Sequence, residues 1–229
     1  MRKALFKYVP RHAYMSITDY LFPERVGRKY KAKYAVPMGG EFVVDVDSHM
    51  RRRIHSHFID PRLEVCEGCL IISKHLALEI CDRITENYRN VQIVFSGRRG
   101  FHLHVVDFDY RDWAKPNATY PLKAMSNARY KYAVKILPHD WDRHHFIVSV
   151  DPMRLITIPN TLNYETGLIC LHLGKPNDLA SLEMHSLLEH ADPTKYVWQT
   201  LFQPCSYPES LTWEAMKAKL AKNRGRDHG

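Results

Sequence analysis

The alternation of apolar and polar residues predicts a chain built from both strands and helices. Strands are predicted at residues 41–47, in a strand pair within 91–107, and at 146–150 and 168–173. Apolar residues at helical spacing predict helices at 69–88, 122–136 and 179–189. Residues 1–40 show little periodicity, and we expect mostly loop with short elements there. This pattern predicts an α+β fold with a mixed or antiparallel sheet flanked by helices.

The segment 91–107 predicts a β-hairpin with a basic tip. Its two apolar runs flank Gly97-Arg98-Arg99-Gly100, and after this turn apolar residues alternate with His102 and His104. One face of the strand should therefore be apolar while the other presents imidazoles. The glycines permit a sharp turn and a close approach to a ligand, and arginine forks suit phosphate oxygens. A solvated turn with incidental charge is the alternative.

Composition favours a globular protein with a polyanionic partner. The chain has 229 residues, of which 45% are hydrophobic and 25% charged, and its formal net charge is +8. We expect one domain over residues 1–229, with a basic helix or tail at about 208–229. Five cysteines do not indicate a disulfide framework, which favours a reducing, intracellular compartment. The N-terminus is polar and the chain has no long apolar run, so we expect no signal peptide and no membrane contact.

Asp45 and Asp47 lie on one side of the predicted strand 41–47. Strand rise separates their Cα atoms by roughly 6.5–7 Å, so both carboxylates can reach the same divalent cations. Two such cations could orient a triphosphate and offset the charge that develops during in-line displacement. The alternative is an exposed strand edge, but the apolar neighbours favour a strand inside the sheet, where unpaired charge is costly.

Cys66 and Cys69, at the start of the predicted helix, indicate a structural zinc site together with His55 and His57. The spacing H-x-H-x8-C-x2-C supplies a tetrahedral ligand set for Zn²⁺, with His49 in reserve. This zinc knuckle would occupy about residues 49–70. A closed site leaves no open coordination position, so we expect no catalysis there. Two buried thiols near unrelated histidines are the alternative.

The order of these features resembles the archaeo-eukaryotic primase superfamily. A D-x-D strand is followed by a cysteine pair opening a helix, by the sequence SGRRGFH at 96–102, and by a Pro-containing segment that ends in Thr166-Gly167. More narrowly, the chain is similar to the small catalytic subunit of archaeal and eukaryotic DNA primase. Residues 10–16 also resemble a segment that precedes the D-x-D strand in archaeal members. The likeness covers about residues 10–167, and SGRRG is its most specific part.

This resemblance implies template-directed synthesis of short primers from nucleoside triphosphates with two Mg²⁺ or Mn²⁺ ions. Asp45 and Asp47 match the family's metal-binding pair. The family motif that holds the phosphates of the incoming nucleotide is matched by Ser96, Gly97, Arg98, Arg99 and His102. Guanidinium forks, a hydroxyl and backbone N–H groups suit a polyanion, and the 3′-hydroxyl of a nucleotide would be the attacking group.

The third family motif differs in this chain. Family members have an acidic residue upstream of a segment resembling LIRLPGSLHxxTG, which here is LITIPNTLNYETG at 155–167. The acidic position falls at His145, the basic position at Thr157 and the family's histidine at Asn163. Reduced, altered or absent polymerase activity is therefore a serious alternative to full activity.

Two nearby residues could replace these losses. Asp151, at the end of the predicted strand 146–150, is our prediction for the third catalytic carboxylate and metal ligand. Its alternative role is to cap a turn before Pro152. Arg154 could replace the lost cation, and Asn163 is expected to contact the nucleotide.

Three functional hypotheses follow. The first is a primase-polymerase that uses nucleoside triphosphates and a single-stranded DNA template beside a large primase subunit. It would be cytoplasmic, at the nucleoid, in an archaeal or viral setting and nuclear in a eukaryote. The second is a non-catalytic relative that binds nucleotide, DNA or a partner subunit. The third is a metal-dependent nuclease using Asp45 and Asp47, which leaves the arginine hairpin without a role.

Overall fold

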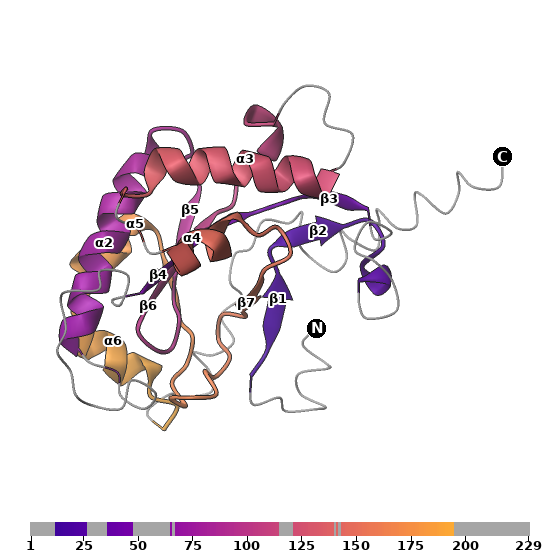
Figure 1. Cartoon of the computed structure of the whole chain (residues 1–229). Coiled ribbons are helices and arrows are strands. Elements are labelled where there is room, and N and C mark those ends of the chain that lie inside the picture. The colour runs from indigo at the N-terminus through magenta and orange to yellow at the C-terminus, as the bar shows by residue number, and fades with distance from the viewer. Residues whose placement is uncertain are drawn as a thin grey trace. The chain divides into compact units, whose positions relative to one another are not determined.

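The central sheet has four antiparallel strands in the order β4–β6–β5–β8. Three of them, β4, β5 and β6, are labelled in Figure 1. The structure is a computed structural model that describes residues 12–26, 36–47, 65, 67–114, 121–139, 141 and 143–194, with only the backbone at 143–145. The strands of this sheet are β4 (Phe42–Asp47), β5 (Val91–Phe95), β6 (Gly100–Val105) and β8 (His172–Gly174). The predicted strand 41–47 and the hairpin are confirmed, and the predicted strand 168–173 is shorter and later.

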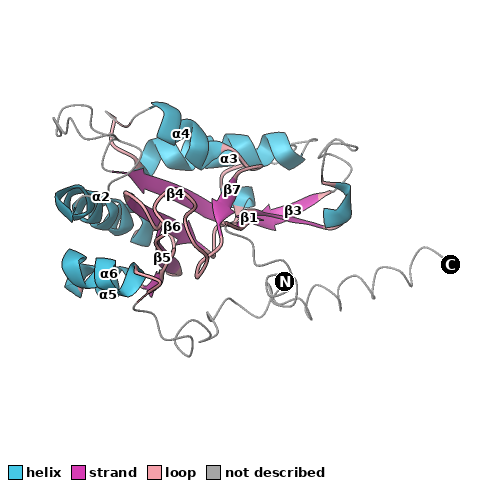
Figure 2. Ribbon diagram, turned by 90° about the horizontal axis from the view of Figure 1, so that it is seen from below, coloured by secondary structure: helices cyan, strands magenta, loops and turns pink. Residues whose placement is uncertain are grey.

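Helices lie along the central sheet, and two short ribbons form separate two-stranded sheets. The helices are α2 (Glu67–Thr85), α3 (Pro121–Ile136), α4 (Arg143–Val150), α5 (Pro176–Ser181) and α6 (Met184–Ala191), with 3-10 turns η1 (Pro23–Arg25) and η4 (Tyr110–Asp112). The ribbons pair β1 (Tyr14–Ser16) with β7 (Leu155–Thr157), and β2 (Thr18–Tyr20) with β3 (Pro37–Gly40). Figure 2 shows α2, α5 and α6 together on one side of the sheet. The expected α+β class is confirmed.

One face of the central sheet is apolar and forms the main core. Direct cross-strand partners point to the same side, so Val44, Leu103 and Ile93 share this face, and all three side chains are completely buried. Tyr132 of α3 contacts Phe42 edge-on, with ring centroids 5.1 Å apart. Burial of this surface is the main driving force for placing α2 and α3 against the sheet.

The opposite face of the sheet is polar but also buried. His102 and His104 on β6 are only 6% and 2% exposed, so this face does not present its imidazoles to solvent as the alternation suggested. Part of the cover comes from the β1–β7 ribbon, where Ile156 packs with Ile17 and Val43. The polar residues of this face are therefore held in a confined, water-poor layer.

The predicted strand at 146–150 is wrong, because these residues lie in helix α4. The β-branched residues Ile147, Val148 and Val150 favour a strand by propensity, but contacts with neighbouring elements decide the outcome. Phe146 contacts Tyr130 of α3 edge-on at 5.4 Å between ring centroids, while Val148 is buried and Ile147 is exposed. Helix α4 thus packs against both α3 and β4.

The predicted helix 179–189 is two helices rather than one. Leu182 and Glu183 have extended backbone angles, which end α5 and begin α6. Leu179 is buried in α5 and Leu187 in α6. The spacing of these apolar residues across the break is the same as in one continuous helix, which explains the prediction. The helices predicted at 69–88 and 122–136 are confirmed as α2 and α3 within a few residues.

Other expectations lie outside the described residues. The basic tail at 208–229 and most of the zinc knuckle at 49–70 fall there, and the single domain over 1–229 stays a prediction. Residues 11–195 group into one compact unit. Among the described residues, no helix combines the length and hydrophobicity needed to cross a membrane.

Replacing Leu103 by alanine tests the central role of the apolar face. Its side chain is fully buried in the middle strand, so Leu103→Ala should lower the free energy of unfolding by about 2–5 kcal/mol. The control Ile71→Ala removes an aliphatic side chain that is 43% exposed on α2, and should cost less than about 1 kcal/mol. Urea denaturation of both variants measures this; equal losses would contradict the assignment of the core.

Candidate functional site

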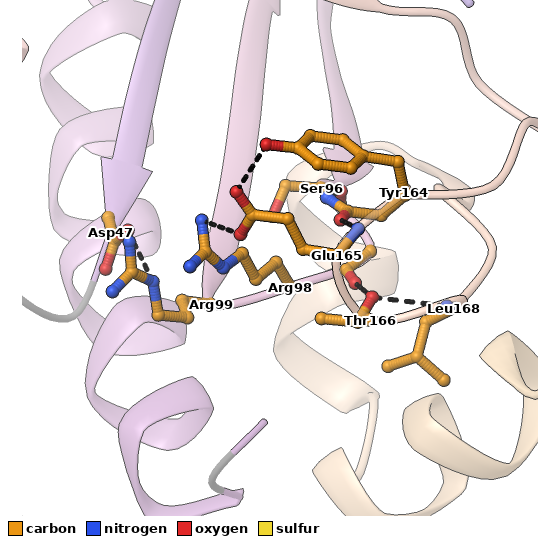
Figure 3. A network of polar contacts seen from close by, with 10 residues as sticks. Asp47, Ser96, Arg98, Arg99, Tyr164, Glu165, Thr166 and Leu168 are labelled. Atoms are coloured by element: carbon orange, nitrogen blue, oxygen red, sulfur yellow. Dashed lines mark hydrogen bonds and ion pairs between the residues drawn. The ribbon is translucent and has the colours of Figure 1, made fainter. Parts of the chain in front are cut away.

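The acidic strand and the arginine hairpin meet at one end of the central sheet. Asp47 is the last residue of β4 and Arg99 lies in the hairpin tip, with Arg99 Nε 3.3 Å from Asp47 Oδ2 (Figure 3). The register pairs Asp47 with Gly100, which brings the tip directly beside the carboxylate. Ser73 on α2 supports the tip by donating a hydrogen bond to the Arg99 carbonyl at 2.9 Å. Residues far apart in sequence thereby form one cluster.

Asp45 lies opposite His102 in the β4–β6 pair. His102 Nε2 is 3.8 Å from Asp45 Oδ1. Burial, together with the smaller effects of the nearby His104 and Arg154, lowers the pKa of His102 to about 3. The imidazole is therefore neutral near pH 7 and can act as a hydrogen-bonding group, but not as a fixed positive charge, beside Asp45.

Arg98 forms an ion pair on the other side of the hairpin tip. Its Nη1 contacts Oε2 of Glu165, and the Tyr164 hydroxyl donates a hydrogen bond to Oε1 of the same carboxylate at 2.8 Å (Figure 3). The hydrogen bond to Glu165 raises the pKa of Tyr164. The two arginines of the tip therefore face two acids, Asp47 from β4 and Glu165 from the turn at 163–167.

The turn at 163–167 is fastened to the hairpin tip through the main chain. Asn163 Nδ2 donates to the Ser96 carbonyl at 3.2 Å, and its Oδ1 accepts from the backbone N–H of Glu165 at 3.0 Å. Thr166 Oγ1 donates to the Gly97 carbonyl at 2.6 Å. Gly97 has a φ of 74°, and a Cβ there would lie 2.9 Å from that of Asn163, so this approach requires glycine.

A second polar cluster lies deeper on the same sheet face. His104 Nδ1 is 2.5 Å from Glu41 Oε2, and both residues are buried. Arg129 of α3 is fully buried and donates to the Glu41 carbonyl through Nη2. Burial lowers the pKa of Arg129 to about 10, so this side chain still carries its charge at neutral pH. Its positive charge offsets the nearby carboxylates of Glu41 and Asp151.

Asp151 follows helix α4 rather than ending a strand. Its Oδ1 accepts a hydrogen bond from the backbone N–H of Met153 at 2.8 Å, which is the turn-capping contact that was the alternative role. Burial raises the pKa of Tyr20, and the negative charge of Asp151 adds to this effect. The same charge opposes the lowering of the Arg129 pKa by burial. Among the described residues, no three acidic, histidine or cysteine side chains form a group able to hold a metal ion. The role of Asp151 as the third catalytic carboxylate stays a prediction.

Arg154 and Thr157 approach the site from the β1–β7 ribbon. Arg154 directly precedes β7, and its positive charge adds to the lowering of the His102 pKa, which is due mainly to burial. Thr157, at the family's basic position, is buried, and its Oγ1 lies 3.1 Å from His12 Nε2. The His12 ring also stacks on Tyr14, with centroids 4.2 Å apart. Burial lowers the pKa of His12, while Glu165 opposes this shift.

Most of the zinc prediction falls outside the described residues. His49, His55, His57 and Cys66 lie there, whereas Cys69 is a buried residue in the first turn of α2. His145 lies within α4, and only its backbone is described. The proposed zinc ligands therefore remain a prediction.

Curated relatives point to one family. The DNA primase small subunit PriS of Pyrobaculum calidifontis is 26% identical over 207 residues, which cover 76% of this chain and 63% of the relative. An uncharacterized DNA primase small subunit-like protein of Archaeoglobus fulgidus is 28% identical, with 74% and 59% covered. The chain resembles the archaeal DNA primase small subunit. PriS of Sulfolobus acidocaldarius is 24% identical, with 73% of this chain and 60% of the relative covered.

The likeness has a defined extent. The matches with these three primase relatives span about three fifths of each relative's length. No protein-family model matches the chain. Similarity to primase small subunits over about three quarters of this chain confirms the resemblance inferred from the D-x-D and SGRRG motifs.

Several residues of this primase-like site were not predicted from the sequence. In the sequence, Glu165 is only one residue of the segment 155–167, Glu41 is the first residue of a predicted strand, and Arg129 lies within the predicted helix 122–136. No local signal distinguishes them, because their partners lie 63 to 88 residues away. His12 belongs to the segment that resembles archaeal primases, and this likeness is the one signal that could have identified it.

Replacing Asn163 tests whether its side chain holds the turn at 163–167 against the hairpin tip. Asn163→Ala removes the hydrogen bonds to Ser96 and Glu165, so the free energy of unfolding should fall by about 1–3 kcal/mol. Asn177→Ala, at an exposed position in α5, should change it by no more than about 0.5 kcal/mol. Chemical denaturation compares the two, and an unchanged stability of Asn163→Ala would refute the fastening role.

Proposed function

We propose that the chain is a primase catalytic core that synthesises short primers from nucleoside triphosphates on single-stranded DNA. The observation that supports this most directly is the 3.3 Å contact between Arg99 and Asp47. It unites an acidic pair suited to divalent cations with an arginine tip suited to phosphates. A triphosphate carrying bound metal ions needs both kinds of group within one site.

The acidic strand would hold the metal ions of this reaction. Asp45 and Asp47 are partly exposed at one end of β4, on the same side of the strand, and they offer the hard oxygen ligands that Mg²⁺ and Mn²⁺ prefer. Asp151 is the proposed third carboxylate. When bound, two such ions would orient the triphosphate and offset its developing charge. The 3′-hydroxyl of the preceding nucleotide would attack the α-phosphorus, and pyrophosphate would leave.

The hairpin tip would bind the phosphates. Arg98 and Arg99 supply guanidinium forks, and Ser96 and Gly97 supply a hydroxyl and backbone amides on a turn held by the segment 163–167. The neutral His102 would donate or accept a hydrogen bond beside Asp45. Arg154 and Asn163 are the remaining proposed nucleotide contacts.

The proposed partners follow from the same reaction. A net charge of +8 favours binding of a single-stranded DNA template. The relatives are named as small subunits of DNA primase, which supports a larger primase subunit as a partner. An intracellular location, in contact with the replicating DNA, is part of this proposal.

A second candidate is a primase-like subunit that binds nucleotide, DNA or a partner without catalysis. The observation that favours it is the use of third-motif positions for structure. Thr157 is buried against His12, and both ends of the Asn163 amide bind the main chain. Such a protein would bind triphosphates but would form no primer with either metal.

Substitution of Asp45 distinguishes these candidates. Asp45→Asn removes one negative oxygen ligand and should reduce metal-dependent nucleotide incorporation on single-stranded DNA by at least about a hundredfold. Asp82→Asn, on the exposed side of α2, removes the same charge and should retain wild-type incorporation. Gel analysis of labelled products with Mg²⁺ or Mn²⁺ gives the rates. Incorporation by Asp45→Asn at the wild-type rate would exclude the catalytic proposal.

Metal analysis tests the proposed structural zinc. We expect about one Zn²⁺ per purified chain if His55, His57, Cys66 and Cys69 are its ligands. Cys66→Ser should lower the zinc content, whereas Cys205→Ser, outside the proposed set, should not. Removing zinc with a chelator should lower the melting temperature, because binding energy at a structural site contributes to folding. Zinc-free wild-type protein of unchanged stability would argue against this site.

A further inference from the structure

Glu165 uses both carboxylate oxygens at the hairpin tip. Oε2 forms the ion pair with Arg98 Nη1, and Oε1 accepts the hydrogen bond from the Tyr164 hydroxyl (Figure 3). The charged partner is one of the two arginines proposed to bind phosphate. A negative group of the same chain therefore already lies on a cation of the proposed nucleotide site.

A carboxylate and a phosphate present similar groups to arginine. Both offer paired oxygens that accept hydrogen bonds from a guanidinium fork, and one guanidinium edge cannot serve two such anions fully. The Arg98 and Glu165 side chains are 23% and 26% exposed, so part of each side chain is open to solvent, while the Oε2 atom at their contact is buried. We infer that Glu165 is an affinity-setting residue that competes with nucleotide phosphates for Arg98. This inference rests on the proposed nucleotide site.

The surrounding contacts allow this exchange without moving the turn. The Glu165 backbone N–H is bound by Asn163 Oδ1, and Thr166 binds the Gly97 carbonyl, so the main chain on both sides of Glu165 is fixed. The carboxylate is connected to that backbone only through rotatable side-chain bonds. Tyr164 is 51% exposed, so the side chain that binds Oε1 lies at the surface of the protein. Phosphate binding thus requires a rotamer change and no rearrangement of the hairpin.

This competition has a measurable consequence. Neutralising Glu165 while keeping its shape removes the competing charge but leaves Arg98 in place. A partly exposed ion pair has a modest strength, so the gain in phosphate affinity should be about two- to fivefold. The effect should weaken as the salt concentration rises, because screening reduces both the ion pair and the phosphate contact.

Calorimetric titration with inorganic tripolyphosphate, without metal, tests the inference directly. Glu165→Gln should bind tripolyphosphate about two- to fivefold more tightly than the wild type. Glu86→Gln is the matched control, because it removes an equal charge just beyond the end of α2 that is remote from the hairpin tip. Its affinity should equal that of the wild type. An equal gain in both variants would show a general charge effect and overturn the inference.

A double-mutant comparison locates the effect at Arg98. Arg98→Gln should weaken tripolyphosphate binding, and adding Glu165→Gln to that variant should restore nothing, because the contested cation is absent. Tyr164→Phe removes only the hydrogen bond to Glu165 and should change the affinity less than Glu165→Gln does. A gain from Glu165→Gln that persists without Arg98 would overturn the inference. Melting temperatures of all variants verify that they remain folded.

The results separate this inference from the proposed catalytic function. If Glu165→Gln tightens tripolyphosphate binding but no variant incorporates nucleotides, the competition stands and primer synthesis fails. If Asp45-dependent incorporation is observed while Glu165→Gln leaves tripolyphosphate affinity unchanged, primer synthesis stands and the competition fails. If neither the wild type nor Glu165→Gln binds tripolyphosphate, the inference is refuted.

Discussion

The close pairing of β4 with the start of β6 is the constraint on which the site depends. A Cβ on Gly100 would lie 1.8 Å from the Val46 carbonyl oxygen, so only glycine permits the two strands to meet at this point. This approach sets Asp47 beside the hairpin tip and Asp45 opposite His102. A one-residue shift in register would turn both carboxylates to the apolar face, and burial of that face makes such a shift costly.

Because the polar face of the sheet is buried, its groups must satisfy one another. Glu41 binds His104, and Arg129 reaches the Glu41 carbonyl from the opposite layer. His102 instead remains neutral, since burial lowers its pKa to about 3. A confined layer of this kind strengthens electrostatic interactions at its open end, where the acidic pair and the arginines lie.

The turn at 163–167 gives the hairpin tip its shape and also supplies an anion to it. Asn163 and Thr166 bind the carbonyls of Ser96 and Gly97, while Glu165 occupies Arg98. Asn163, which stands at the position of a histidine in the third primase motif, here holds the hairpin tip through the Ser96 carbonyl. The same segment therefore fixes the shape of the hairpin tip and also contacts one of its two arginines.

The sequence by itself determined the acidic strand, the arginine hairpin, the helices α2 and α3, and the likeness to primases, because each rests on local periodicity or a short motif. It failed at 146–150, where packing on β4 and α3 overrides the strand propensity of β-branched residues. The sequence also could not reveal the ion pair of Glu165 with Arg98. Nor could it reveal the contacts of Glu41 with His104 and of His12 with Thr157. Such pairs join residues distant along the chain, and only the tertiary structure decides which polar groups must share a buried space.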